Sequence, residues 1–485
     1  MFDSGSDAIA RHWIDGAWLT SKRVGSSINP SNGAILGEFA DGGFDEAQAA
    51  IAAARHAFDS GTWAFDRNLR ATALLELAQR IDERASRLAS SLSREMGKVI
   101  TQAGWEAVAS AQTIRYNAGA AVSQTGTAAE QGPGLLASTW REPIGVAGII
   151  VPWNAPIALL ARALGPALAA GCTVVVKMPG QTALTNAIVA EAIAATESLP
   201  KGVVNMFTES RNDGAPFLVA SADVDVINYT GSTKVGRMIA AQAATTLKRT
   251  TLELGGKTPL IVFEDADINV AAPLVVRALT QFNGEFCMTG SRVLVQRSVA
   301  NAYRKRLAEL LEAVRLGPAD QETSEMGPLL DRNNVDRVDR IVEEAAAYAK
   351  VLVRGGRSND AALAKGAFYR PAMLESEAID VPLIQDEIFG PVLSFETFKE
   401  EDEAVTRANA TIYGLAAAVF TKDIDRATRV VRRVKAGTIW TNTWALLSDA
   451  VEEGGFKSSG IGRMRGARAM EEFQEIKTHF LLYAA

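Results

Sequence analysis

The sequence predicts an α/β protein built from two doubly wound domains. Apolar segments without charges alternate with helical patterns from residue 145 onward, and a second alternating series begins at Pro259. The chain has 485 residues, enough for about three domains of roughly 150 residues each. Continuous apolar strands between helices are typical of a parallel sheet that is covered on both faces.

The first alternating series follows two amphipathic helical patterns, at 44–59 and 67–95. Its expected strands are 145–151, 173–177, 203–207 and 226–229, and its expected helices are 156–170, 183–196 and 233–244. The charge-free stretch 143–161 has about the length of a membrane span, but Pro152, Asn154 and Pro156 interrupt it. We therefore expect a buried strand, a loop and the start of a helix there.

The second alternating series fills the C-terminal half of the chain. Its expected strands are 260–263, 291–296, 416–421 and 438–442, with one helix that reaches Phe282 and another that begins at Val299. No short repeat and no low-complexity linker separates the two series. We therefore expect the domains to share broad interfaces.

Composition and charge exclude several classes of protein. The formal net charge is −6 and the basic residues are dispersed, which argues against a nucleic-acid partner. Two cysteines cannot build a disulfide framework, and no Cys and His residues have metal-ligand spacing. The N-terminus lacks the basic and apolar regions of a signal peptide. We expect a cytoplasmic protein with no metal, nucleic-acid or membrane partner.

Cys287 is the most informative single residue. An apolar helical pattern runs into Asn283-Gly284, which breaks the helix and places the thiol on a tight loop. A thiol in that position is a candidate nucleophile. Taken alone, a single cysteine is more often a small buried hydrophobic residue.

Two features indicate a nucleotide site. The segment Thr230-Gly231-Ser232-Thr233-Lys234-Val235-Gly236 follows an expected strand and opens a helix, where backbone N–H groups and the helix dipole can hold a phosphate. Its glycine spacing differs from GxGxxG, and a structural turn explains it equally well. Lys177 ends an expected strand and would project into the crevice where nucleotides bind, unless it is an ordinary surface lysine.

Two polar residues at strand ends could take part in catalysis. Glu253 ends an apolar strand before a Gly-Gly turn, where partial desolvation would raise its pKa toward that of a general base. An ion-paired glutamate is the alternative. Asn154 lies in a strand-to-helix loop between two prolines, from which its amide could donate to an oxyanion. Asparagine in such a loop is more often a turn residue.

Taken in order, these motifs resemble the NAD(P)-dependent aldehyde dehydrogenase superfamily. The resemblance also rests on three later motifs: Glu387-Ile388-Phe389-Gly390-Pro391, Asn409 with Tyr413-Gly414-Leu415, and Gly454-Gly455-Phe456-Lys457-Ser458-Ser459-Gly460-Ile461-Gly462. It spans nearly the whole chain. It implies a Rossmann-like cofactor domain, a catalytic α/β domain, and a small β extension that joins subunits into homodimers or homotetramers. The expected boundaries are 1–122 with 144–252, then 253–462, and 123–143 with 463–485.

The resemblance also implies the role of each residue. Cys287 would attack the aldehyde, the Asn154 amide and the Cys287 N–H would hold the oxyanion, and Glu253 would activate water against the thioester. NAD or NADP would accept the hydride. The residues that would bind this cofactor are Trp153, Lys177, Gly180, Gly231, Ser232, Gly236, Glu387 and Phe389.

Some positions depart from the family pattern. Gly180 stands where most members carry an acid that binds the ribose 2′-OH, so NADP becomes admissible. Glu285 replaces the usual glutamine, and its charge would oppose the thiolate if it pointed inward. Arg162 stands where members acting on carboxylated semialdehydes also carry arginine, although a salt-bridged helix residue is the alternative. The residues expected to contact the substrate are Arg162, Ala155, Phe286 and Phe456, with Ala155 widening the pocket.

We therefore predict an enzyme that oxidises a small aldehyde to a carboxylic acid, with a carboxylated semialdehyde as the candidate substrate. One alternative is a CoA-acylating semialdehyde dehydrogenase, in which CoA resolves the thioester. Members of that type commonly lack an acid at the position of Glu253. The other is a non-catalytic structural member, which would need neither Cys287 nor Glu253.

Overall fold

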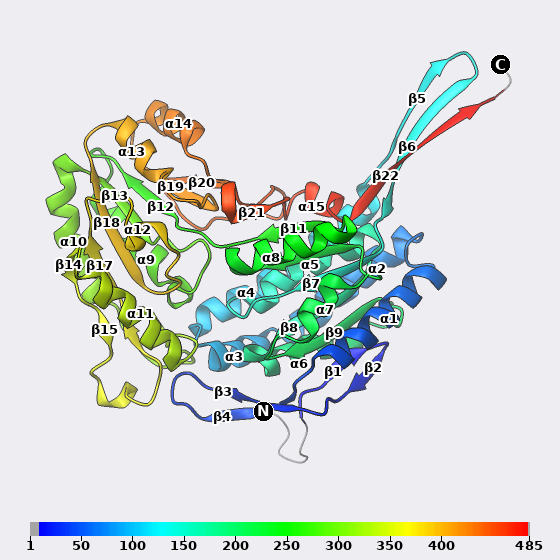
Figure 1. The fold of residues 1–485 in the computed structure, drawn as a ribbon, viewed down its shortest axis with the longest axis horizontal. Helices are drawn as coiled ribbons and strands as arrows, with labels where there is room; N and C mark the ends of the chain where they lie inside the picture. Colours follow the sequence, from blue (N-terminus) through cyan, green and yellow to red (C-terminus); the bar gives the residue numbers. More distant parts are fainter. Residues whose placement is uncertain (1–8, 484–485) are drawn as a thin grey trace.

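A computed structural model describes residues 9–483, which form two α/β lobes and a projecting β arm (Figure 1). The eight-stranded sheet of the first lobe has the order β2-β1-β9-β8-β7-β10-β11-β21. Its strands are β1 (His12–Ile14), β2 (Ala17–Leu19), β7 (Val146–Ile150), β8 (Thr173–Pro179), β9 (Val204–Glu209), β10 (Val226–Thr230), β11 (Arg249–Glu253) and β21 (Gly460–Ile461). The five central strands are parallel, which confirms the predicted α/β fold class.

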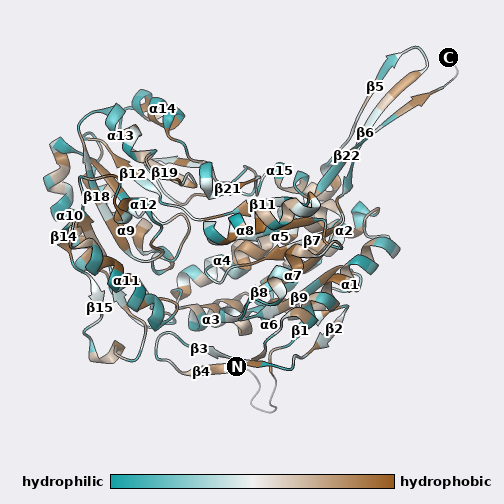
Figure 2. Ribbon diagram, in the orientation of Figure 1, coloured by the Kyte–Doolittle hydropathy of each residue, from teal (hydrophilic) through white to brown (hydrophobic). Residues whose placement is uncertain are grey.

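Helices cover both faces of this sheet because β7 alternates its side chains between them. Val146 and Ile150 pack with α1, α7 and α8, whereas Ala147 and Ile149 pack with the helices from α2 to α6. The helices are α1 (Phe44–Ser60), α2 (Arg67–Asp82), α3 (Ala85–Met96), α4 (Ile100–Ser123), α5 (Pro156–Ala170), α6 (Ala183–Ala194), α7 (Gly214–Ala220) and α8 (Thr233–Ala243). Figure 2 shows brown, apolar residues along α5, which lies in the interior, and teal residues on outer helices such as α14.

The expected single helix over 67–95 is wrong. The chain forms α2 and α3 instead, because Arg84 leaves helical geometry with φ −104° and ψ 1°. The bend lets α3 pack against α6 as well as α4.

The second lobe holds a seven-stranded sheet of order β14-β17-β18-β13-β12-β19-β20. Its strands are β12 (Pro259–Val262), β13 (Arg292–Gln296), β14 (Lys350–Val353), β17 (Ala372–Glu375), β18 (Val392–Phe398), β19 (Ala416–Phe420) and β20 (Thr438–Thr441). Its helices are α9 (Ile268–Thr280), α10 (Ala300–Glu312), α11 (Arg332–Ala345), α12 (Pro382–Gln385), α13 (Glu401–Ala408) and α14 (Ile424–Arg433). Only β14 runs antiparallel to its neighbour.

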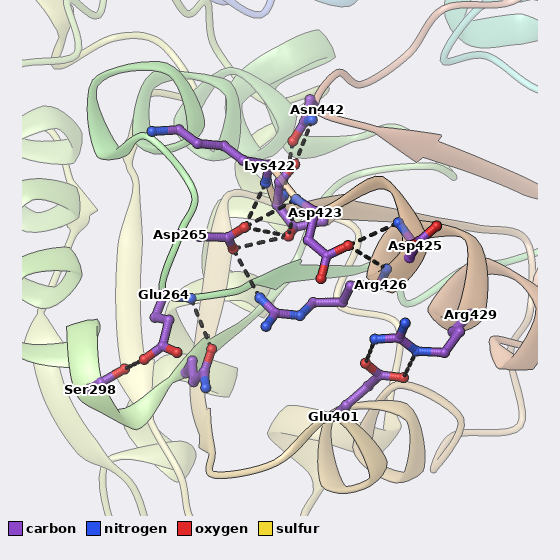
Figure 3. A network of polar contacts seen from close by, with 12 residues as sticks. Glu264, Asp265, Ser298, Glu401, Lys422, Asp423, Asp425, Arg426, Arg429 and Asn442 are labelled. Atoms are coloured by element: carbon purple, nitrogen blue, oxygen red, sulfur yellow. Dashed lines mark hydrogen bonds and ion pairs between the residues drawn. The ribbon is translucent and has the colours of Figure 1, made fainter.

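Hydrogen bonds around Asp265 tie together the loops at the carboxyl ends of β12 and β19 (Figure 3). The Asp265 carboxylate accepts from the Thr421 hydroxyl and from the backbone N–H groups of Lys422 and Asp423. The amide of Asn442, just after β20, pairs with both backbone groups of Thr421. These bonds fix the start of the irregular segment after β20, which contributes to the site described below.

The arm is a three-stranded sheet of β5 (Thr127–Gly132), β6 (Leu135–Pro143) and β22 (Gln474–Leu482) that projects from the first lobe (Figure 1). Its apolar side chains Ile476, Phe480 and Leu482 are 62%, 65% and 79% exposed. The remaining elements are a hairpin of β3 (Val24–Ile28) and β4 (Ile35–Ala40), the short pair β15 (Gly356–Arg357) and β16 (Tyr369–Arg370), and α15 (Arg468–Glu471). Within residues 9–483, no helix has the length and apolarity needed to span a membrane.

Candidate active site

Cys287 lies on a strained loop after α9. The helix ends at Thr280 rather than at Phe282, because Gln281 is extended, with ψ 134°, and Phe282 and Asn283 then adopt left-handed geometry, with φ of 50° and 59°. Gly284 has φ 79°, and a Cβ there would lie 2.5 Å from the carbonyl carbon of Gly390. The loop can therefore pack against the 387–391 segment only with glycine at this position. The thiol at its end is partly accessible.

The turn after Glu253 lies directly against the nucleophile. A Cβ on Gly256 would come within 2.4 Å of the Cys287 carbonyl oxygen, so the two backbones touch. The Gly256 N–H donates to Glu387 Oε1 over 3.0 Å. The structure thus brings the predicted residues Glu253, Cys287 and Glu387 to one place, although they come from distant parts of the chain.

Asn154 reaches the same loop from the first lobe. Its side-chain Nδ2 donates to the Glu285 carbonyl over 3.1 Å, which leaves the second N–H of the amide for another acceptor. Among the described residues, the Cys287 backbone N–H has no hydrogen-bond acceptor. The Asn154 amide is therefore held against the loop that carries Cys287, and both groups are candidate donors to an oxyanion on a Cys287 adduct.

Burial dominates the electrostatics of the two reactive groups. It raises the pKa of the Cys287 thiol to about 12, and the Arg162 guanidinium opposes this shift. Burial also raises the pKa of Glu253 to about 8, again against Arg162. Glu253 Oε1 makes no hydrogen bond within the described part of the chain. At neutral pH the thiol and most of the Glu253 population are therefore protonated.

Glu285 points away from the thiol. Both of its carboxyl oxygens accept from the Leu330 N–H at 3.2 Å. The positive charge of Arg337 lowers the pKa of this carboxyl, against the larger effect of burial. The Glu285 side chain is fully buried, so the pKa of this carboxyl lies well above its usual value. Glu285 thus serves the contact between its loop and the Leu330 segment, and it does not oppose formation of the thiolate.

A cavity of about 620 Å³ opens at the carboxyl ends of β7, β8 and β10. Four of the predicted cofactor residues line it: Trp153, Lys177, Gly231 and Ser232. Ser232 caps α8, and the free N–H groups at the start of that eleven-residue helix favour a phosphate. Phe389 meets the Trp153 ring edge-on at 5.7 Å. The donor set and the size of the cavity fit a nicotinamide dinucleotide.

The predicted cofactor residues Gly236 and Gly180 lie outside this cavity. Gly236 does not line the cavity; a Cβ there would lie 2.4 Å from Leu254 Cδ2, so this glycine lets α8 pack closely against Leu254. Gly180 lines a neighbouring cavity of about 460 Å³, where a Cβ would lie 2.6 Å from Ser210 Cβ. An acid at position 180 would therefore require Ser210 to move. The expectation that Gly180, by lacking an acid, makes NADP admissible stays a prediction.

Arg162 is already paired, which corrects the expectation that it is free to hold a substrate carboxylate. Its Nη1 donates to Glu453 Oε1 over 2.6 Å and its Nη2 to the Thr230 hydroxyl over 2.9 Å. The other oxygen of Glu453 accepts from Arg465 over 2.7 Å. Arg162 and Glu453 are 4% and 5% exposed. The alternative of a salt-bridged helix residue therefore describes the pairing of Arg162 in this structure.

The remaining predicted substrate residues differ in their placement. Ala155 is buried at the start of α5, and the Phe286 ring packs edge-on against Trp444 at 5.9 Å. Phe456 is 43% exposed, and its ring lies 5.5 Å from the Arg463 guanidinium. Sequence reasoning missed Trp444 and Glu453, because neither lies in a motif with a chemical signature.

The fold and the site define an oxidoreductase with a cysteine nucleophile, a nearby carboxyl group and a cleft for a dinucleotide. Among residues 9–483, no cluster of three or more His, Cys, Asp and Glu side chains could hold a metal ion. The chain belongs to the aldehyde dehydrogenase family, whose model matches residues 18–479.

Similar proteins agree with this assignment. Betaine aldehyde dehydrogenase of Bacillus subtilis (strain 168) is 36% identical over 470 residues, 96% of each chain. Aldehyde dehydrogenase 1 of Tanacetum cinerariifolium is 37% identical over 455 residues, 93% of this chain and 90% of that protein. A crystal structure of betaine aldehyde dehydrogenase from Staphylococcus aureus in complex with NAD+ has a TM-score of 0.95 at 32% identity, covering 98% of this chain and 95% of that chain. The chain is therefore an NAD(P)-dependent aldehyde dehydrogenase, as the sequence predicted.

We expect Cys287→Ala to abolish oxidation of every aldehyde while cofactor binding stays nearly intact, because the substitution removes the bond-forming atom and little volume. Cys172→Ala is the matched control. Its thiol is fully buried, donates to the Phe473 carbonyl and has a pKa raised to about 12. Steady-state assays and cofactor titration check both variants. Appreciable turnover by Cys287→Ala would rule out the mechanism.

Glu253→Gln should keep the first burst of reduced cofactor and then stall, because only hydrolysis of the thioester needs the base. In the unmodified enzyme this step should accelerate as pH rises through about 8, since the pKa of Glu253 is raised by burial and only the carboxylate accepts a proton. Rapid mixing between pH 6 and 9 measures both effects. Loss of the burst in a folded variant would show that Glu253 acts earlier.

For Asn154→Ala we expect the rate of the burst to fall by about 100-fold to 1,000-fold, the usual cost of one oxyanion donor. The fold should survive, because Asn154 makes one side-chain hydrogen bond, to Glu285. A fall of less than tenfold in the rapid-mixing assay would count against the oxyanion role.

Proposed function

We propose that this enzyme oxidises an aldehyde to a carboxylic acid through a thioester on Cys287 that water resolves. The observation that carries this proposal is the convergence of Cys287, the Glu253 turn and the Asn154 amide beside the dinucleotide-sized cavity. Glu253 favours hydrolysis over transfer to CoA, because a buried carboxyl with a pKa of about 8 suits a general base.

Different residues carry out the successive steps of this mechanism. The Cys287 thiol gives up its proton to water, its Sγ bonds to the carbonyl carbon as the C=O π bond breaks, and the Asn154 amide with the Cys287 N–H holds the oxygen that gains the negative charge. A bound NAD or NADP supplies the hydride acceptor. Glu253 then takes a proton from water, the resulting hydroxide attacks the thioester, and the Cys287 thiolate leaves.

The same residues imply how the cofactor is held. Lys177 would contact the adenosine ribose and Ser232 the pyrophosphate at the start of α8. Glu387 would bind the nicotinamide ribose, since its carboxylate lies on the Gly256 turn next to Cys287. Because the pKa of the thiol is about 12 without a cofactor, the protein groups alone leave Cys287 weakly nucleophilic.

For the substrate, we propose an aldehyde whose far end is uncharged in place of the carboxylated semialdehyde that the sequence indicates. Glu453 occupies the position at Arg162 that a substrate carboxylate would take. Displacing it would break a buried ion pair, which typically costs about 3–5 kcal/mol. A neutral group faces no such cost.

The proposed division of the chain follows the chemistry. Residues 1–122 and 144–252 would bind the cofactor, residues 253–462 would carry the nucleophile and base, and residues 123–143 with 463–485 would join subunits. Exposed Ile476, Phe480 and Leu482 on the arm support a homodimer or homotetramer, because a lone sheet seldom leaves such side chains in water. The two unpaired cysteines are in keeping with a reducing, cytoplasmic location.

The substrate proposal predicts a gain of function. Glu453→Gln should raise kcat/KM for succinate semialdehyde by about 10-fold to 100-fold, because Arg162 becomes available and a charged hydrogen bond contributes about 1.5–3 kcal/mol. Efficiency on pentanal should change much less. Glu452→Gln, which removes the same charge from an exposed neighbour, is the control.

The comparison between the two substrates also tests the unmodified enzyme. We expect it to favour pentanal over succinate semialdehyde in kcat/KM. A preference for the semialdehyde, with no gain in Glu453→Gln, would mean that Arg162 exchanges Glu453 for the substrate carboxylate.

A further inference from the structure

Lys98 and Glu106 form a fully buried ion pair between the lobes. Lys98 lies in the short connection between α3 and α4, and Glu106 lies about two helical turns further along, on α4. Both side chains are 0% exposed, and Lys98 Nζ donates to Glu106 Oε2. A buried pair of this kind contributes to a structure only when further hydrogen bonds satisfy its remaining oxygens and protons. The partners of this pair are therefore informative.

Glu106 holds the start of the helix that follows Asn154. Its Oε1 accepts from the backbone N–H groups of Ile157 and Ala158 over 3.0 and 3.2 Å. These groups belong to the first turn of α5, whose N-cap residue, Ala155, has no side-chain acceptor. A carboxylate from α4 thus replaces the missing cap and interacts favourably with the helix dipole. Because Asn154 immediately precedes Ala155, this contact fixes the position of the Asn154 backbone, from which the side-chain amide extends.

Lys98 holds the loop that carries Cys287. Its Nζ lies 3.6 Å from the centroid of the Phe282 ring, a cation–π contact in a fully buried site. The Phe282 ring in turn packs edge-on against Phe286, the neighbour of Cys287, at 5.0 Å. One ion pair therefore touches the two segments that carry the candidate oxyanion donors.

Two further contacts attach the same helix junction to that loop. Gln102 on α4 accepts from the Phe282 N–H over 2.9 Å, and the Gly97 carbonyl accepts from Asn283 Nδ2 over 2.8 Å. The strained backbone at Phe282 and Asn283 is thus held by neighbours of Lys98 on both sides. These contacts secure the loop itself, whereas the ion pair also reaches the first turn of α5 through Glu106.

We propose that Lys98 and Glu106 are positioning residues that set the separation between the Asn154 amide and the Cys287 backbone N–H. Neither touches the reacting atoms. The inference rests on the proposed function, because it matters only if these two donors hold the oxyanion. A displacement of about 1 Å at such a site can cost roughly 100-fold in rate. Loss of the pair should therefore affect oxyanion stabilisation more than binding.

A double-mutant cycle with Asn154→Ala tests the proposal. The rate of the burst of reduced cofactor is measured by rapid mixing for Lys98→Met, for Asn154→Ala and for the double variant. We expect Lys98→Met to slow the burst by about 10-fold to 100-fold in the otherwise unmodified enzyme, with little change in the aldehyde KM. In the Asn154→Ala background it should slow the burst by less than about threefold, because the donor that it positions is gone.

The matched control is Arg292 with Glu396, an ion pair whose side chains are likewise both 0% exposed and which joins β13 to β18. Arg292→Met removes an equally buried cation. It should slow the burst by the same factor in the unmodified enzyme and in the Asn154→Ala background. If the cost of Lys98→Met is likewise equal in the two backgrounds, the pair only supports the fold, and the proposal is overturned.

If Lys98→Met shows no cooperative thermal unfolding, the same cycle is measured with Glu106→Gln in its place. Glutamine keeps an acceptor for the α5 N–H groups and removes only the charge. Equal costs of Glu106→Gln in both backgrounds would overturn the proposal. If Asn154→Ala itself costs nothing, the oxyanion role in the proposed function fails. If Asn154→Ala slows the burst by about 100-fold but Lys98→Met slows it by the same factor in both backgrounds, only the positioning role is rejected.

Discussion

The site depends on a contact between two backbones. The chain leaves the first sheet at Glu253, the end of β11, and enters the second sheet at β12, and the turn between them lies against the Cys287 carbonyl. A side chain at Gly256 would push that carbonyl away, since its first carbon would come within 2.4 Å. The crossing between the sheets is thus also the place where base and nucleophile meet. Both lobes must keep their relative position for the two residues to act on one substrate.

Burial and charge then decide the resting state of the nucleophile. Desolvation raises the pKa of Cys287, and the one cation that opposes it most, Arg162, has its charge offset by Glu453. The thiol therefore rests in its protonated, less reactive form. Glu453 thus has two effects: it pairs with the Arg162 guanidinium, and it weakens the pull of that arginine on the thiol.

Features that depend on a local residue pattern could be predicted from the sequence. Contacts between residues far apart in the chain could not. Strands such as β7 and β10 were predictable because their runs of apolar residues are bounded by turn residues, and Cys287 because its helix breaks at Asn283-Gly284. The Arg162–Glu453 pair spans 291 positions, so no spacing could indicate it. Gly180 illustrates the same limit, because only the fold shows that Ser210 occupies the space beside it.

Helix α5 connects these observations. It begins at Pro156, just after Asn154, and carries Arg162 six residues later, about 9 Å along the axis at 1.5 Å per residue. Thirteen of its fifteen residues are buried, and this close packing itself resists sliding of the helix along its axis. Glu106 at its first turn and Glu453 at Arg162 supply directional bonds that oppose such sliding. A shift of this helix would displace the oxyanion donor and the nearest cation together, which explains why an apolar helix is held by buried charges at both points.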